Sequence, residues 1–187
     1  HMLSARRELN FLFGDWSNKQ VNLWKVIRTQ TTLTQGTATY SVPNSTIMVL
    51  DASIVLNFGT ANESRRYVTP ISRTEYLSFA NQQIQAVPTC YWFDRLISPT
   101  VTFWPVPDGN GPYTWDFFSC IQQQDANLAG GETPDAPYRW NDCIVAGMAH
   151  RLARIYAPNL EAIRKADAQE SWSSTAAQDT ENVPFVL

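Results

Sequence analysis

Apolar residues at helical spacing mark the beginning of the chain. Leu9, Leu12 and Trp16 recur three or four positions apart, with Phe13 beside them. This spacing predicts an amphipathic helix over residues 4–18 with Ser4 as its N-cap. Such a helix must bury its apolar face, and the best partner is the helical region at the other end of the chain.

The same period returns near the end of the chain. A stripe from Trp140 to Ile155 predicts a second helix, which Pro158 ends. A weaker stripe predicts a third helix over residues 160–177. Residues 122–137 come before this region and read as a long loop with two glycines and two prolines.

Between the two ends, the period changes from helix to strand. Residues 24–42 alternate apolar and polar positions around Gln35-Gly36, which predicts two strands joined by a turn. Residues 47–56 are almost continuously apolar, as in a strand buried on both faces. A short strand over 65–68 follows. Residues 72–75 then read Ser-Arg-Thr-Glu, a capping box for a short helix that ends near residue 79.

Three aromatic and β-branched runs occupy residues 88–95, 99–108 and 113–121. Ser98-Pro99 separates the first two, and a turn signal over 108–112 separates the last two, so the pattern predicts a β-meander. On the third strand, alternate residues share one face and are aromatic: Tyr113, Trp115 and Phe117.

The predicted fold class is α+β. A helical bundle forms from the N- and C-terminal helices, and an antiparallel β-sandwich or meander domain is inserted between them. We expect the N-terminal helix of the helical domain over 3–20 and the antiparallel β domain over 21–125. We expect the C-terminal helices over 138–177 and an extended tail over 178–187.

Composition limits the classes of function. Of 187 residues, 44% are hydrophobic, 12% aromatic and 17% charged, and the net charge is −3. A low content of charged residues together with many aromatic residues is typical of a protein that buries part of its surface against partners. A large aromatic core would explain the same composition equally well. The negative charge argues against a general nucleic-acid binder. Residues 138–165 nevertheless hold five basic and two acidic residues, so the C-terminal helices form a basic end.

No residues assemble into a catalytic or metal-binding motif. Apart from His1, His150 is the only histidine, and the three cysteines (Cys90, Cys120 and Cys143) lie in apolar runs without metal spacing. We therefore predict no enzyme activity, no cofactor and no metal. The simplest interpretation is that the three cysteines are buried thiols in a protein of a reducing compartment. No run approaches the length of a membrane span.

Two other patterns leave alternatives open. Asp94 and Asp116 would suit a glycoside hydrolase if their strands lay in one sheet, although a structural role is favoured. Trp92, Trp104 and Trp115 could stack on sugars or bases, but core or subunit contacts are favoured over that role.

Several segments, taken in order, resemble a known family: VNLWKV at 21–26, LTQGTATYSVP at 33–43, LDA at 50–52, ISRTEY at 71–76 and FWPVPD at 103–108. Together with the aromatic runs they look like the head-to-tail adaptor (connector) proteins of short-tailed bacteriophages. The tail tubular protein A type and the packaged-DNA stabilisation type belong to that family. The resemblance covers roughly residues 3–121.

The resemblance implies a structural virion protein at the head-tail junction, assembled in the host cytoplasm. Such proteins form a ring, usually of twelve copies, between the portal protein and the tail nozzle protein, and they help to retain packaged DNA. The helical part would face the portal, and DNA contact would be passing and without sequence specificity. We expect a monomer in isolation and a ring only on the portal.

The expected contacts with portal or neighbouring subunits are the basic helical end and the apolar tail: Arg151, Arg154, Val183, Phe185, Val186 and Leu187. An aromatic interface is predicted at Trp92, Trp104 and Trp115. Two functions from other classes are alternatives: a carbohydrate-binding module of a phage tail or secreted enzyme, and a glycoside hydrolase fragment.

Overall fold

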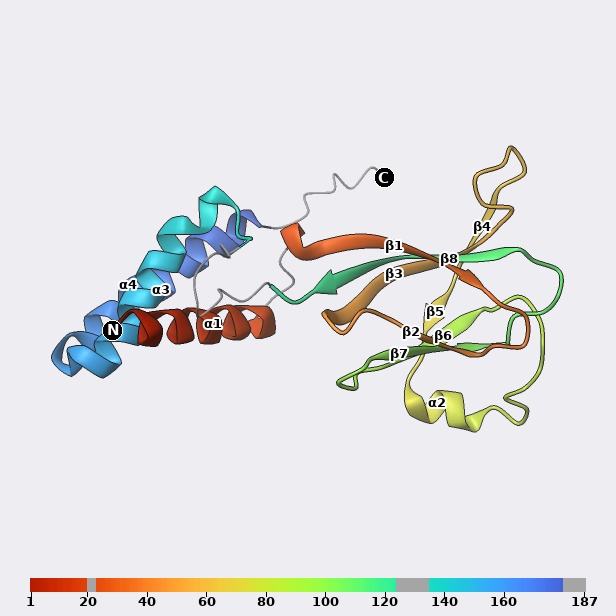
Figure 1. Ribbon diagram of the computed structural model, residues 1–187, viewed down its shortest axis with the longest axis horizontal. Coiled ribbons are helices and arrows are strands. Elements are labelled where there is room, and N and C mark those ends of the chain that lie inside the picture. Colours follow the sequence, from red (N-terminus) through yellow and green to blue (C-terminus); the bar gives the residue numbers. More distant parts are fainter. Residues whose placement is uncertain (20–22, 124–134, 180–187) are drawn as a thin grey trace. The chain divides into compact units, whose positions relative to one another are not determined.

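The computed structural model describes residues 1–19, 23–123 and 135–179 (Figure 1). It divides into two compact units. The helical unit comprises His1–Lys25 and Gln122–Leu187, and the β unit comprises Val26–Ile121.

The three helices predicted at the two ends of the chain are confirmed, but the first begins at Met2, so Ser4 lies within it and is not its N-cap. They are α1 (Met2–Lys19), α3 (Asn141–Tyr156) and α4 (Glu161–Gln178). Three 3₁₀ turns accompany them: η1 (Leu23–Lys25), η2 (Tyr138–Trp140) and η3 (Pro158–Leu160). As expected, α3 ends just before Pro158: its last residue is Tyr156 and Ala157 is the C-cap.

One hydrophobic cluster joins the helices of the helical unit. Helices α1 and α4 each contact α3. The ring of Trp140 lies 5.1 Å from that of Trp16 and 4.8 Å from that of Trp24. The buried members of the cluster are Leu12, Phe13, Trp16, Trp140, Cys143 and Ala176. The two ends of the chain therefore share one core, whereas a bundle arrangement of the helices stays a prediction.

The β unit is built from eight strands and one short helix. The strands are β1 (Val26–Leu33), β2 (Thr39–Ser41), β3 (Thr46–Leu56), β4 (Ser64–Tyr67), β5 (Thr69–Pro70), β6 (Cys90–Asp94), β7 (Thr100–Trp104) and β8 (Tyr113–Ile121). They form two sheets, in the orders β1-β8-β3-β4 and β2-β7-β6-β5 (Figure 1). Helix α2 (Arg73–Ser78) lies between β5 and β6 in sequence.

The predicted three-stranded meander is wrong. Strands β6 and β7 do pair, but β8 lies in the other sheet between β1 and β3. Aromatic faces bury more area when they oppose each other across a core than when they stand side by side in one sheet. Accordingly, the ring of Phe103 in β7 meets that of Trp115 in β8 edge to face at 5.2 Å. Of the two architectures predicted, the β unit adopts the sandwich.

The second sheet also corrects the expectation of a purely antiparallel domain. Strand β5 pairs in parallel with β6, through Thr69 with Cys90 and Pro70 with Tyr91. This pairing is only two residues long and lies at the sheet edge, where a proline can replace a hydrogen-bond donor. The β unit therefore contains one antiparallel and one mixed sheet.

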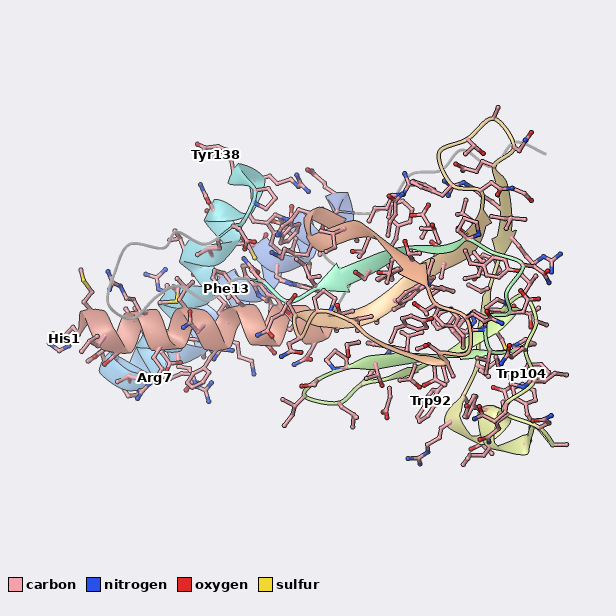
Figure 2. The ribbon with its side chains drawn as sticks, turned by 45° about the vertical axis from the view of Figure 1, so that its right-hand side comes forward. His1, Arg7, Phe13, Trp92, Trp104 and Tyr138 are labelled. Carbon is pink, nitrogen blue, oxygen red and sulfur yellow. The ribbon has the colours of Figure 1, made fainter. Side chains whose placement is uncertain are left out.

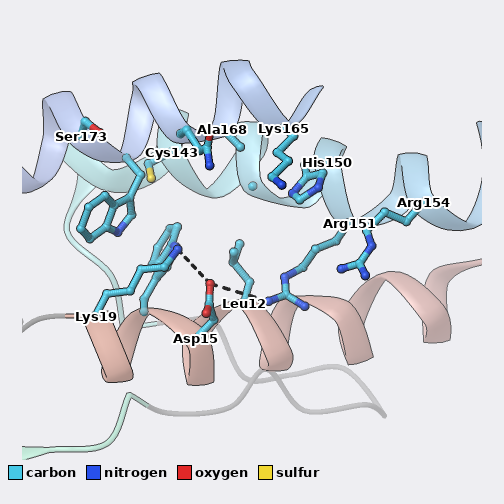
Figure 3. Close-up of a pocket in the computed structure, with 14 residues that line it drawn as sticks. Leu12, Asp15, Lys19, Cys143, His150, Arg151, Arg154, Lys165, Ala168 and Ser173 are labelled. Carbon is cyan, nitrogen blue, oxygen red and sulfur yellow. Dashed lines mark ion pairs between the residues drawn. The ribbon is translucent and has the colours of Figure 1, made fainter. Parts of the chain in front are cut away.

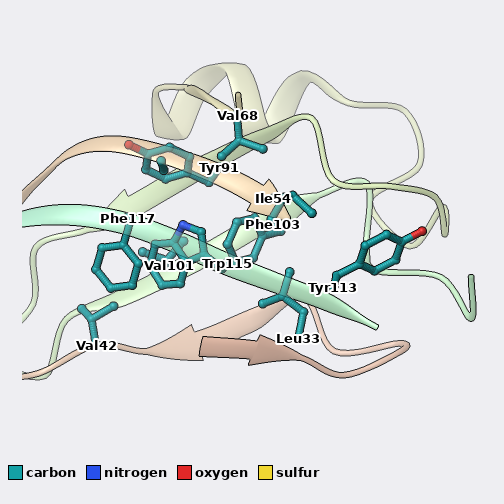
Figure 4. Packing of buried hydrophobic residues seen from close by; sticks show 11 residues of the cluster. Leu33, Val42, Ile54, Val68, Tyr91, Val101, Phe103, Tyr113, Trp115 and Phe117 are labelled. Atoms are coloured by element: carbon teal, nitrogen blue, oxygen red, sulfur yellow. The ribbon is translucent and has the colours of Figure 1, made fainter. Parts of the chain in front are cut away.

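The core of the sandwich lies between the inner faces of the two sheets (Figure 4). Trp115 has 0% of its surface exposed and stacks on Phe117 at 3.6 Å between ring centroids. Tyr113, Trp115 and Phe117 all belong to this core, which confirms that they share one face. These three inward-facing aromatics thus fix the position of β8.

Strand β3 differs in part from its prediction. It is a strand, but its apolar residues are deeply buried only in its second half, at Ala52, Ile54 and Val55. Asp51 is exposed and lies within an irregularity in the pairing of β3 with β8, between Val49 and Ala52. A bulge of this kind lets a strand turn one charged residue to solvent without burying it.

The predicted capping box at the start of α2 is confirmed. The Glu75 amide donates to Ser72 Oγ at 3.2 Å, and the Ser72 amide donates to Glu75 Oε2 at 2.6 Å. Phe79, which ends the helix, stacks on Trp104 with ring centroids 3.8 Å apart. Helix α2 is thereby fixed against the second sheet.

Replacing the central tryptophan of the sandwich tests this packing. We expect Trp115→Ala to lower the free energy of unfolding by about 3–5 kcal/mol, because it leaves a cavity that the two sheets cannot close. Ile97→Ala is the control: Ile97 is 95% exposed, and a surface substitution changes stability by about 0.5 kcal/mol or less. Urea unfolding followed by tryptophan fluorescence and circular dichroism measures both. Equal effects of the two variants would contradict the packing described.

Candidate functional site

A groove lies between α1, α3 and α4 of the helical unit (Figure 3). Its volume is about 660 Å³. Apolar and small side chains line it beside a set of charged ones. The apolar and small members are Leu12, Trp16, Cys143, Gly147, Ala168 and Trp172, and the charged members are Asp15, Lys19, Arg151, Arg154 and Lys165.

Helical spacing brings these side chains to one place. On α1, Leu12, Asp15, Trp16 and Lys19 follow one another at intervals of three, one and three residues and so share a face. The residues of α3 and α4 that line the groove recur at similar helical intervals. The groove therefore forms where the lining faces of the three helices lie against one another.

A glycine lets α1 approach α3 closely. A Cβ atom added to Gly147 would lie 2.8 Å from Cδ2 of Leu12, closer than real Cβ contacts allow. Leu12 is itself buried, so its side chain has little room to move away. Gly147 thus sets the depth at which Leu12 lies in the groove.

Ion pairs connect the helices across the groove. Arg151 lies 3.7 Å from Glu8 and 3.9 Å from Asp15, and its NH2 nitrogen also donates to the carbonyl oxygen of Phe11. Asp15 pairs with Lys19 at 2.9 Å. Because only 17% of the Arg151 side chain is exposed, this arginine mainly holds α1 against α3.

Arg154 is the more accessible of the two predicted arginines. Its side chain is 58% exposed and lies 3.6 Å from Glu161. Arg154 is therefore accessible to a partner, whereas Arg151 already pairs with residues of its own unit. The structure brings both to one groove, and it adds Lys19 and Lys165, which the sequence analysis missed.

A signal for the missed residues was present in the sequence. Lys165, like Arg154, belongs to the predominantly basic stretch over residues 138–165. Lys19 belongs to the stripe that includes Leu12 and Trp16, but its place opposite α4 depends on tertiary packing. Its ammonium lies 5.2 Å from the ring of Trp172.

The groove lacks the chemistry of an active site. Burial, followed by the charge of Arg154, lowers the pKa of His150, so this imidazole is neutral at pH 7. Burial raises the pKa of the Cys143 thiol to about 11, which keeps it protonated and unreactive. Within the described parts of the chain, no three potential ligands come together to hold a metal ion.

The prediction of buried thiols is confirmed: Cys90, Cys120 and Cys143 are all buried, and none of them forms a disulfide bond. None of the described helices is long and apolar enough to cross a membrane.

The predicted aromatic interface is corrected at one position. Trp115 is buried in the sandwich core, so it offers no surface to a partner. Trp92 and Trp104 lie on the other sheet beside α2 (Figure 2), where they contact Tyr76 and Phe79 respectively. The three tryptophans therefore do not form one platform.

The carboxylates suggested for a glycoside hydrolase lie in different sheets. Asp94 is in β6 and Asp116 is in β8, which corrects the idea that their strands share a sheet. Asp116 accepts hydrogen bonds from Arg28, whose Nε lies 2.8 Å away, and from Arg65. Its carboxylate is saturated by structural partners rather than directed at a substrate.

These arginines make Asp116 an unusually strong acid. Hydrogen bonds from Arg28, and then those from Arg65, lower its pKa from 3.8 to about 2 against the opposing effect of burial. The residue is 4% exposed, while each arginine covers it with a side chain that is nearly half exposed. The cluster therefore ties β1, β8 and β4 together on the outer face of one sheet.

Four of the predicted contact residues (Val183, Phe185, Val186 and Leu187) lie outside the described residues. Their role as a docking tail stays a prediction.

Comparison with known proteins shows the family. A family model described as SU10 adaptor protein matches residues 4–183. No curated protein matches the chain. Since the match covers nearly the whole chain, the protein belongs to the SU10 adaptor protein family, a phage head-to-tail adaptor family. The resemblance seen in the sequence is thereby confirmed, and the protein is a structural phage adaptor.

The Asp116 cluster predicts a pH dependence of stability. The pKa is lower in the folded than in the unfolded chain, so the cluster stabilises the fold above pH 4 and loses this contribution as the pH falls towards 2. Because both arginines are partly exposed, we expect about 1–2 kcal/mol. Urea unfolding of Asp116→Asn at pH 6 and pH 3 should show a smaller pH difference than wild type. Asp94→Asn, which lies in the other sheet, should leave that difference unchanged; an unchanged difference in Asp116→Asn would refute the assignment.

Proposed function

We propose that this phage adaptor forms a ring between the portal protein and the tail nozzle protein and helps to retain packaged DNA. The observation that carries the proposal is the family match over residues 4–183. The ring of twelve copies, the place at the head-tail junction of the virion and assembly in the host cytoplasm follow from the resemblance to portal-bound adaptors.

The portal contact is proposed for the helical unit. Its cations Arg154 and Lys165 are exposed and favour contact with acidic residues of a neighbouring protein, which is either the portal or the adjacent subunit of the ring. Arg151 supports the contact by holding α1 against α3. The tail segment Val183, Phe185, Val186 and Leu187 is proposed to add apolar contacts, since large apolar side chains gain about 1.5–3 kcal/mol each when buried, before ordering costs.

DNA retention is proposed to depend on obstruction rather than on affinity. The net charge of the chain is −3, and a protein that held DNA tightly would need an excess of cations. A ring that closes the exit needs only passing, sequence-independent contact with DNA. The nozzle protein would bind the opposite side of such a ring.

A carbohydrate-binding module is less well supported. Sugar binding requires an exposed aromatic platform, whereas Trp115 is buried and Trp104 is stacked on Phe79. The partial cover of Trp92 by Tyr76 leaves no pair of these tryptophans to hold a sugar ring.

Sedimentation with purified portal tests the proposal. Alone, the protein should sediment as a single chain of 21.1 kDa. With the portal, it should co-sediment as a ring. A stable ring of pure protein would contradict the expected monomer, and failure to bind any portal under assembly conditions would refute the portal-bound ring proposed here.

Deleting residues 183–187 tests the tail. If the tail docks on the portal, the melting temperature of the isolated protein should barely change while portal binding is lost. The matched control is replacement of the same five residues by a Gly/Ser segment, which should behave like the deletion. A fall of several degrees in melting temperature with assembly intact would place the tail in the protein's own core.

We expect no hydrolysis of peptidoglycan or of generic glycans. Asp94 and Asp116 lie in separate sheets and Asp116 is held by two arginines, so these two carboxylates do not form a catalytic pair. Reducing-end assays with the wild type, Asp94→Asn and Asp116→Asn measure this. Turnover by the wild type that either substitution removed would overturn the prediction.

A further inference from the structure

Two opposite faces of α4 carry charges of opposite sign. The side towards the groove includes Lys165, Ala168, Gln169, Trp172 and Ser173. The other side borders a second hollow of about 360 Å³. Its lining residues are Asp142 of α3 and Asp167, Glu170, Ser171, Ser174 and Thr175 of α4. Since successive helical residues are separated by about 100°, these two sets lie on opposite sides of α4.

The two surfaces match in charge. Four cations and one carboxylate line the groove, and burial leaves His150 neutral. Three carboxylates and no cation are found among the described residues of the second hollow, here called the acidic face. A basic groove and an acidic face of equal and opposite net charge are therefore present on a single helical unit.

Some of these charges are free to meet a partner. In the described parts of the chain, neither Lys165 nor Glu170 makes an ion pair, and both are exposed. Arg154 and Asp167 do have partners, but their side chains are 58% and 49% exposed. Exposed charges with weak internal pairing can change partners at little cost.

We propose that the acidic face of one copy docks into the basic groove of a second copy. A second copy is the occupant that the charges favour, because the same chain presents both complementary surfaces. The contact is head to tail, since the two surfaces differ, and repeated contacts of this kind generate a closed ring when the rotation closes. The inference rests on the proposed ring and names the surfaces that join neighbouring subunits.

A contact of this chemistry is weak enough to agree with the monomer expected for the isolated protein. Each exposed ion pair contributes about 0–1 kcal/mol and is weakened by salt. The acidic face is completed by hydroxyl groups and lacks large apolar residues to strengthen it. Copies held side by side on a portal have a high effective concentration, so a weak contact then suffices to order them.

Reversing the charge of one surface at a time tests the proposal. The groove variant combines Arg154→Glu with Lys165→Glu, and the face variant combines Asp167→Lys with Glu170→Lys. In either variant alone, like charges meet at every contact, so filling the portal should require at least about tenfold more protein than the wild type needs. Mass photometry of portal complexes at about 0.1 M salt counts the bound copies.

An equal mixture of the two variants provides the decisive measurement. Every contact between unlike variants again joins opposite charges, so the mixture should fill the portal within about twofold of the wild-type concentration. A chain that carries all four substitutions should also fill the portal within about twofold of the wild-type concentration. The controls are Arg7→Glu on α1 and Asp51→Lys in the β unit, which line neither surface and should assemble like the wild type. Circular dichroism confirms that every variant is folded.

The outcomes separate this inference from the proposed function. If the wild type does not assemble on the portal, the proposed ring itself fails. If the wild type assembles and both variants assemble equally well, the subunit contact lies elsewhere and this inference is overturned. If the folded groove variant loses portal binding and the mixture does not restore it, the groove receives an acidic surface of the portal rather than a second copy.

Discussion

The β unit depends on the contact between two aromatic faces. Phe103 and Trp115 meet edge to face across the sandwich, and Phe117 stacks on Trp115. Because this contact requires β7 and β8 to oppose each other, β8 joins β1 and β3 instead of continuing beside β7. The outer face of β8 then presents Asp116 to Arg28 and Arg65, so the ion cluster on the sheet is a consequence of the same choice.

In the helical unit, the corresponding constraint is the close approach of α1 to α3. Gly147 leaves room for Leu12, and Arg151 connects α3 to Glu8 and Asp15 of α1. Helix α4 completes the groove with Lys165 and Trp172. Charged residues that are far apart in the sequence thereby form one basic surface, while the other side of α4 is left acidic.

These two units suit an adaptor better than an enzyme. The family match identifies a structural phage protein, and the chemistry of the groove consists of charges and apolar contacts with a neutral histidine and a protonated thiol. Surfaces of moderate charge and limited apolar area give contacts that form in a preorganised assembly and remain weak in solution. That balance is what the proposed ring on a portal would require.

The sequence by itself determined the elements and the family. Helical periods gave α1, α3 and α4, the Ser72–Glu75 pair gave the start of α2, and alternation placed Trp115 among inward-facing residues. These features depend on neighbours within one or two turns, so local pattern reveals them. Only the tertiary structure decided that β8 changes sheets, that Asp94 and Asp116 are separated, and that Lys19 faces α4. Each of these depends on which faces pack together. Segments that are far apart in the sequence compete for that packing, so the local pattern of apolar residues does not predict the result.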